Sequence, residues 1–204
     1  MSNNSISYMV LAYFLGAIPT AYLAGKWLKG LDIREHGSGN VGTTNAFRVL
    51  GKGPGSAVFI IDFLKGAVPV YLFKMSAAGS LASSSLVLCV GVAALLGHVY
   101  TPFLRFKGGK GIAAGAGMLA VGFPAPFLIV LTVWVLTFFI TRIVSVSSMG
   151  AVLALAIAGQ VLGYRLETNL IFSALAVFIF WTHRSNIARL LKGEEGRKVN
   201  KTDI

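Results

Sequence analysis

The sequence predicts an all-α integral membrane protein of about seven transmembrane helices, with its N terminus outside and its C terminus in the cytoplasm. Composition is the first reason. Of 204 residues, 55% are hydrophobic and 12% are charged, whereas soluble domains carry roughly 25% charged residues. The other two reasons are the spacing of long apolar runs and the uneven distribution of lysine and arginine along the chain.

A membrane-spanning helix needs ~20 mostly apolar residues, and seven runs reach or approach that length. They cover residues 6–25, 56–73, 86–102, 111–123, 126–141, 146–164 and 169–181. The first run lacks a small-residue cleavage pattern, so we expect a retained helix and not a signal peptide. The short, glycine-rich run 111–123 predicts a tilted, shielded or partly inserted segment. Residues 1–204 are expected to form one domain with a flexible tail at 195–204.

Alternate loops differ strongly in basic residues. One set holds 15 of them, the other holds only Lys74 and Arg165, and Lys65 lies inside a run. The 15 are Lys26, Lys29, Arg34, Arg48, Lys52, Arg105, Lys107, Lys110, Arg142, Arg184, Arg189, Lys192, Arg197, Lys198 and Lys201. Because basic loops remain in the cytoplasm, this split predicts the orientation.

The net charge of +11 predicts contact with anionic lipid headgroups or anionic substrates. It does not predict nucleic-acid binding, because the basic residues lie between apolar runs and never form a long basic arm. The single cysteine, Cys89, lies in an apolar run and excludes an intrachain disulfide.

The first segment whose residues suit binding or catalysis is a glycine-rich loop followed by Arg48. Its members are Gly37, Ser38, Gly39, Asn40, Gly42, Thr43, Thr44 and Asn45. The glycines have the spacing of a dinucleotide fingerprint, but a transmembrane run and not a strand precedes them. Glycines let consecutive N–H groups surround an anion, and an arginine fork suits phosphate. The alternative is an ordinary polar turn beside a cytoplasmic arginine.

A second segment places two lysines, Lys107 and Lys110, among the glycines Gly108, Gly109 and Gly111. This pattern suits a polyanionic group. It lacks the serine or threonine of a P-loop, so nucleotide hydrolysis is not predicted. The alternative is positive-inside anchoring. His98, upstream, is expected to pack a helix end nearby.

A third segment closes the last apolar run. If it is helical, His183 and Asn186 lie on one face and can reach one ligand together. The alternative is an interfacial helix end with a solvated histidine.

Asp62 and Lys65 lie inside an apolar run, three residues apart. Charges in lipid are costly and face the bundle interior, so we expect a structural pair that braces the basic site. Ser145, Ser147 and Ser148 are either packing residues or phosphate donors. The sequence holds no paired-carboxylate site, Cys/His cluster or Gly-x-Ser-x-Gly elbow, so we expect no metal and no cofactor.

Together these segments resemble one family, the bacterial integral-membrane glycerol-3-phosphate acyltransferases of the PlsY type, which use acyl phosphate. The residues that carry the resemblance, in chain order, are Gly37–Asn40, Gly42, Thr44–Asn45, Arg48, Asp62–Gly66, Gly97–His98, Pro102, Phe106–Gly111, Val144–Ser145, His183–Arg184, Asn186–Ile187, Arg189–Leu190 and Gly193–Glu194. The chain departs at Thr43, where the family usually has alanine. No counterpart is recognised for the tail after Glu194.

The resemblance implies acyl transfer from acyl phosphate to the 1-hydroxyl of sn-glycerol 3-phosphate, at the cytoplasmic side of a bacterial inner membrane. It assigns Arg48 and Lys110 to substrate phosphate, and it assigns Ser38, His183 and Asn186 to the glycerol hydroxyl. The expected substrate-binding set is completed by Gly37, Gly39, Asn40, Gly42, Thr44, Asn45, Lys107, Gly108, Gly109 and Ser145. Either His183 or the donor's own phosphate can take the proton.

The competing class is a transporter or flippase for a phosphorylated metabolite, because broken glycine-rich helices and basic residues also line transport sites. Against it, the basic groups gather on one face and no internal repeat is visible. Neither the oligomeric state nor the acyl-chain preference follows from the sequence.

Overall fold

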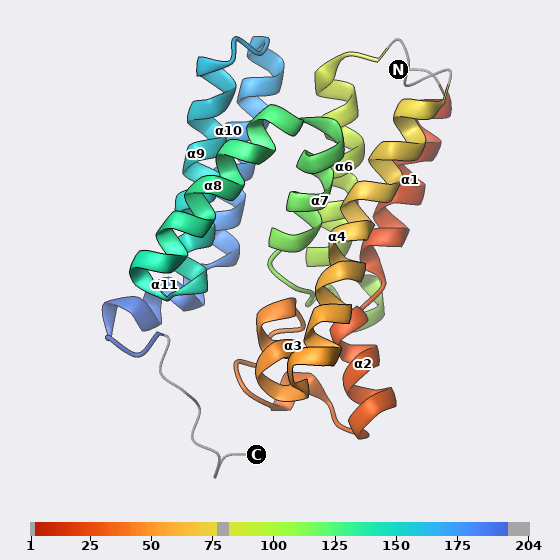
Figure 1. Cartoon of the computed structure of the whole chain (residues 1–204). Helices are drawn as coiled ribbons and strands as arrows, with labels where there is room; N and C mark the ends of the chain where they lie inside the picture. The colour runs from red at the N-terminus through yellow and green to blue at the C-terminus, as the bar shows by residue number, and fades with distance from the viewer. Residues whose placement is uncertain (1–2, 77–81, 196–204) are drawn as a thin grey trace. The chain divides into compact units, whose positions relative to one another are not determined.

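The structure, a computed structural model, describes residues 3–76 and 82–195, and within those residues it contains helices and loops but no β-strand (Figure 1). The chain divides into two compact units, Met1–Gly122 and Phe123–Ile204. The helical part of the predicted fold is confirmed for the described residues.

The first unit contains the helices α1 (Asn3–Ala17), α2 (Thr20–Lys29), α3 (Thr43–Leu50), α4 (Lys52–Met75), α6 (Ser84–Val99) and α7 (Ile112–Gly122), with short 3₁₀ turns η1 (Ile33–Glu35) and η2 (Pro102–Leu104). Helix α1 packs on α6, and α4 packs on α7 and α6 (Figure 1). Helix α3 packs on the start of α4.

Glycines allow these helix pairs to approach closely. A Cβ on Gly97 of α6 would lie 2.0 Å from the Tyr13 carbonyl oxygen of α1, and one on Gly117 of α7 would lie 1.9 Å from the Phe63 carbonyl oxygen of α4. Small residues at such contacts let backbones meet where lipid offers no hydrophobic driving force. They therefore determine which helices can pack together here.

The second unit contains α8 (Pro124–Thr141), α9 (Val144–Val161), α10 (Leu166–Thr182) and α11 (Arg184–Leu191). Helix α9 packs on both α8 and α10. At one end of the unit, the rings of Phe123, Tyr164 and Phe172 pack edge to face, with centroids 5.3–5.9 Å apart.

Within the described residues, five helical stretches are long and apolar enough to cross a membrane, and α10 with α11, bent by 58°, supplies a sixth. The predicted run 6–25 falls in the first stretch, Ser5–Lys29, which is interrupted between α1 and α2. The predicted short run forms α7, whose 11 residues extend about 16 Å at ~1.5 Å per residue. Because α7 packs on α4 and α6, its shielding by neighbours is confirmed, while the seven-span count stays a prediction.

The predicted ion pair inside α4 is present. Asp62 and Lys65 are 1% and 5% exposed, and Lys65 Nζ lies 2.6 Å from Asp62 Oδ1. Lys65 also donates to the Ile18 carbonyl at 2.5 Å. That carbonyl lies at the break before Pro19, where the chain leaves the α1 helix, so the ion pair also satisfies an acceptor at the break.

We expect Lys65→Met to be strongly destabilising because it leaves the buried Asp62 carboxylate uncompensated, at a cost of about 3–5 kcal/mol. The double variant Asp62→Asn/Lys65→Met removes both charges and should recover part of that loss. Unfolding of the purified variants in detergent measures both effects. A double variant no more stable than Lys65→Met would contradict the assignment.

Candidate functional site

The first glycine-rich segment forms a tight loop that Asn45 holds in place. Gly37 and Gly39 have φ of +63° and +68°, a region that side chains with a Cβ rarely adopt. The buried Asn45 side chain accepts from the Ser38 N–H at 2.9 Å and donates to the carbonyls of Ile33 and His36. The Asn45 amide therefore shapes the loop, while its assignment to substrate binding stays a prediction.

Asn40 has a similar part in the loop, because its Oδ1 accepts from the Gly42 N–H at 2.9 Å. The next two residues, Thr43 and Thr44, begin α3. Backbone N–H groups at a helix start have no acceptor within the helix and carry its positive dipole. Arg48 lies one turn further on, and a Cβ on Gly37 would sit 3.3 Å from its Cδ. Loop, helix start and Arg48 are thus adjacent.

The second segment folds back onto the end of α6. The N–H groups of Gly108 and Gly109 donate to the carbonyls of Val99 and His98, at 2.9 and 3.1 Å. A Cβ on Gly109 would lie 2.1 Å from His98 Nε2, so His98 packs where predicted. The two glycine N–H groups were predicted to cradle an anion, yet here they bond to α6 because the loop needs this close backbone approach. Lys107 and Lys110 carry the segment's charge.

The two segments meet at Gly42 and Gly109. A Cβ on Gly42 would lie 4.0 Å from the Gly109 Cα. Asp62 lies behind both segments. Its Oδ2 accepts from the Thr43 hydroxyl at 3.3 Å, and its Oδ1 lies 3.8 Å from His98 Nδ1. Thr43, the residue that departs from the family pattern, thereby connects the first segment to the buried ion pair.

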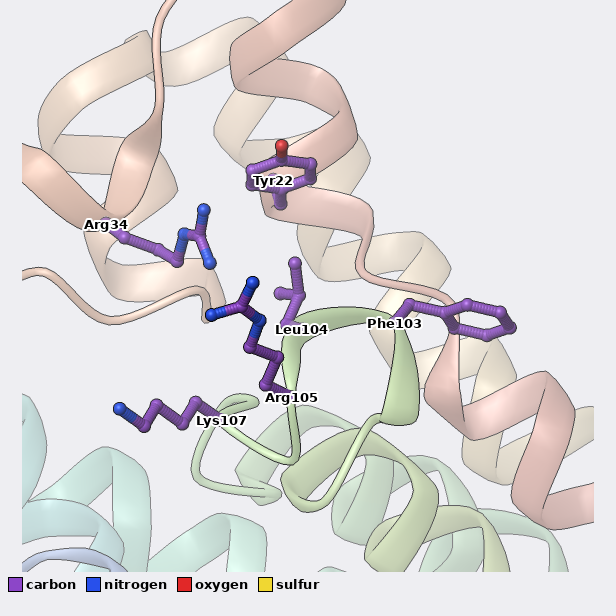
Figure 2. Close-up of a pocket in the computed structure, with 6 residues that line it drawn as sticks. All are labelled: Tyr22, Arg34, Phe103, Leu104, Arg105 and Lys107. Carbon is purple, nitrogen blue, oxygen red and sulfur yellow. The ribbon is translucent and has the colours of Figure 1, made fainter.

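A cleft of about 430 Å³ opens beside the second segment, and Figure 2 shows the residues that line it. They are Tyr22, Arg34, Phe103, Leu104, Arg105 and Lys107. Arg34 is held by two hydrogen bonds from its guanidinium to Asp32, at 2.6 and 3.0 Å. These bonds lower the pKa of Asp32 to about 2. Arg34 and Arg105 were not predicted to share a site, because their loops are far apart along the chain.

In the second unit, His183 lies at the bend between α10 and α11. Its Nδ1 is 2.8 Å from the Ile179 carbonyl oxygen. Because a carbonyl only accepts, Nδ1 carries the hydrogen, and in the neutral ring Nε2 is the acceptor nitrogen. The ring is 3% exposed, so its orientation is fixed.

Ser145 of α9 and Asn186 of α11, both predicted site residues, are joined by Glu195. Glu195 Oε1 accepts from the Ser145 hydroxyl at 2.8 Å and from Asn186 Nδ2, and Oε2 lies 2.6 Å from Arg189 Nε. Partial burial raises the pKa of Glu195, but these three hydrogen bonds outweigh it and leave the pKa below its ordinary value. Glu195 was assigned to the flexible tail, so its contacts with these side chains were not predicted; residues 196–204 of that tail lie outside the described residues.

The other two serines of α9 have local partners. Ser147 donates to the Ile143 carbonyl at 3.0 Å and Ser148 to the Val144 carbonyl at 2.9 Å. These are bonds within one helical turn, so the packing alternative fits both residues. Within residues 3–76 and 82–195, no group of three or more His, Cys, Asp or Glu side chains could hold a metal ion.

The long apolar helices and the basic, glycine-rich loops define the class as a multi-pass integral membrane protein. A family model described as glycerol-3-phosphate acyltransferase matches residues 6–193. A curated relative of that name from Chlorobaculum tepidum is 44% identical, over 94% of this chain and 95% of its own. Another, from Exiguobacterium sibiricum, is 43% identical over 94% and 92%.

Two solved structures are also similar. PlsY, an integral membrane glycerol 3-phosphate acyltransferase, in its glycerol 3-phosphate form has a TM-score of 0.88 and 37% identity over 96% of both chains. Its lysophosphatidic acid form has a TM-score of 0.85 at the same identity, covering 96% of this chain and 95% of that chain. The present chain belongs to the glycerol-3-phosphate acyltransferase family. It is an acyltransferase of phospholipid synthesis, and the transporter alternative is set aside.

The Glu195 contacts predict a pH-dependent stability. Because the folded pKa lies below the ordinary value, the carboxylate stabilises the fold at neutral pH, and that contribution is lost as pH falls through the lowered pKa. Glu195→Gln should therefore melt at a lower temperature than the parent at pH 7. The difference should shrink below about pH 4.3, the ordinary glutamate value.

Melting curves in detergent across this pH range measure the difference, with Glu194→Gln at the exposed neighbouring position as the control. A parent and Glu195→Gln that melt together at pH 7 would contradict the role given to the carboxylate.

Proposed function

We propose that this enzyme transfers a fatty acyl group from acyl phosphate to the 1-hydroxyl of sn-glycerol 3-phosphate, which yields lysophosphatidate and inorganic phosphate. The observation that carries the proposal is the meeting of the two glycine-rich segments at Gly42 and Gly109, with Arg48, Lys107 and Lys110 on the same segments. Solved relatives in glycerol 3-phosphate and lysophosphatidic acid forms support the acceptor and the product. This reaction begins phospholipid synthesis.

Acyl phosphate is a mixed anhydride with a good leaving group. The 1-hydroxyl oxygen attacks the acyl carbon, the bond from that carbon to the phosphate oxygen breaks, and the hydroxyl proton leaves. Such a reaction needs positioning and charge neutralisation more than it needs a strong base. The hydroxyl proton passes either to His183 Nε2 or to the departing phosphate, and either acceptor accounts for it.

The proposed roles follow the chemistry of each group. Arg48 offers a planar fork to phosphate, and Lys107 and Lys110 offer point charges. The start of α3, at Thr43 and Thr44, offers backbone N–H groups to the donor phosphate. For the glycerol hydroxyl we propose Ser38, together with Asn186 and His183 of the second unit. Ser145 is proposed to bind substrate, in place of its bond to Glu195.

We further propose one catalytic domain in a bacterial inner membrane, with seven spans and the site on the cytoplasmic side. The family match over residues 6–193 covers both units and supports the first point. The distribution of lysine and arginine, with 15 in one set of alternate loops and two in the other, supports a site on the cytoplasmic side.

The donor provides the direct test of the reaction. Purified enzyme with acyl phosphate and glycerol 3-phosphate should release phosphate at a rate that EDTA does not change, because no step requires a metal. Acyl coenzyme A should be a poor donor, because the basic segments suit a small phosphate headgroup whose acyl tail stays in the bilayer. Turnover with acyl coenzyme A alone, or loss of the rate in EDTA, would refute this mechanism.

Lys110→Ala removes a charge assigned to substrate phosphate. By analogy with the loss of one preorganised donor, the rate should fall by ~10² to 10³ while the fold is retained. Arg48→Lys keeps the charge but loses the fork, and it should also be severe. Phosphate release by the folded variants measures both. A Lys110→Ala enzyme with more than about half the parent rate would remove this residue from the site.

Topology can be tested by cysteine labelling in a Cys89→Ala background. An impermeant maleimide should modify Asn3→Cys from outside, and it should reach Gly53→Cys only after the membrane is permeabilised, because the basic loops face inward. The reverse labelling pattern would invert the proposed orientation.

A further inference from the structure

The cleft beside the second segment holds two arginines, Arg34 and Arg105, that the proposed reaction does not use. Arg34, Arg105 and Lys107 all line it (Figure 2), and they come from the η1 turn and from the loop after η2. The nearby carboxylate of Asp32 is already engaged by Arg34. An excess of positive charge therefore surrounds a space of about 430 Å³, which a phosphate-sized anion would neutralise.

The backbone holds Arg105 at this cleft in an unusual conformation. Arg105 and Phe106 have φ of +53° and +60°, and among the described residues only Arg142 is another non-glycine residue with positive φ. Such a conformation persists only where its surroundings enforce it. Here Leu104, 5% exposed, is packed in a buried cluster against Tyr22, and the Phe106 N–H donates to the Thr101 carbonyl at 2.8 Å. In Figure 2 the guanidinium groups of Arg105 and Arg34 both point into the cleft.

Exposed aromatic side chains lie next to these cations. Phe103, which lines the cleft, and Phe106, which lies between Arg105 and Lys107 in the chain, are each 61% exposed. In a membrane protein, exposed apolar rings beside basic groups suit the boundary between the acyl chains and the anionic lipid headgroups. A ligand for this cleft therefore has an anionic head and an apolar body.

We propose that the cleft binds the headgroup of an anionic phospholipid of the surrounding membrane. The lipid phosphate lies between Arg34 and Arg105, and the acyl chains run past Phe103. Charge complementarity favours this occupant over a zwitterionic lipid, and the exposed rings favour it over a water-soluble phosphate. The site is distinct from the acyl-transfer chemistry, although Lys107 borders both, and its occupation does not depend on the identity of the acyl donor.

The test compares lipids of equal chain length on the purified full chain. Native mass spectrometry after delipidation and titration should show one phosphatidylglycerol retained in preference to phosphatidylcholine. Arg105→Gln should weaken that retention by about fivefold or more, the effect of one cation near an anionic lipid surface. Phe103→Ser should weaken it as well. Lys52→Gln, at an exposed basic position outside the cleft, is the matched control and should change little.

Equal retention of the two lipids would overturn the proposal, as would equal losses in Arg105→Gln and Lys52→Gln, which would indicate a diffuse surface charge. Displacement of phosphatidylglycerol by glycerol 3-phosphate or inorganic phosphate at the same concentration would identify a soluble phosphate as the occupant. Melting temperatures verify that each variant is folded. Phosphate release with both substrates is measured in parallel, so that a failure of the proposed reaction is seen separately from a failure of lipid binding.

Discussion

The buried carboxylate of Asp62 is the group on which the first unit depends. A charge inside an apolar helix costs several kcal/mol unless it is paired and hydrogen-bonded. Lys65 supplies the pair, and the Thr43 hydroxyl supplies a further bond. Through Lys65 the same group is connected to the break after α1 at Ile18. The first glycine-rich segment and a helix break are therefore attached to the Asp62–Lys65 pair of α4, which holds both in place.

Glycine serves close approach in this protein more than it serves anion binding. Gly108 and Gly109 lie against the end of α6 so tightly that a Cβ would fall about 2 Å from its atoms, and their N–H groups are used there. The same property joins α4 to α7 at Gly117. In such a loop the cationic side chains and a helix start are the groups that can meet a phosphate. In this motif the glycines therefore allow close backbone packing, while the neighbouring cations and helix start are the groups available to bind phosphate.

Much of this could be predicted from the sequence. Apolar runs located the long helices, and spacing along α4 identified the Asp62–Lys65 pair, because both signals are local and periodic. The roles of Asn45 and of Gly109 could not be predicted, since each depends on which backbone atoms another segment brings near. That Arg105 and Arg34 share a cleft was not predicted, for the same reason. Glu195 was missed because nothing in a single sequence distinguishes an acid held by Asn186 and Arg189 from one in a frayed tail.

The few acidic side chains show how the charge is distributed. There are 7 of them against 18 lysines and arginines, and Asp32, Asp62 and Glu195 each bind a cationic side chain: Arg34, Lys65 and Arg189. Each of these paired carboxylates orients a cation or a neighbouring hydrogen-bond donor. The basic residues outnumber the acidic ones, so the electrostatic potential around the basic segments stays positive. A positive field stabilises charge that develops on a departing phosphate.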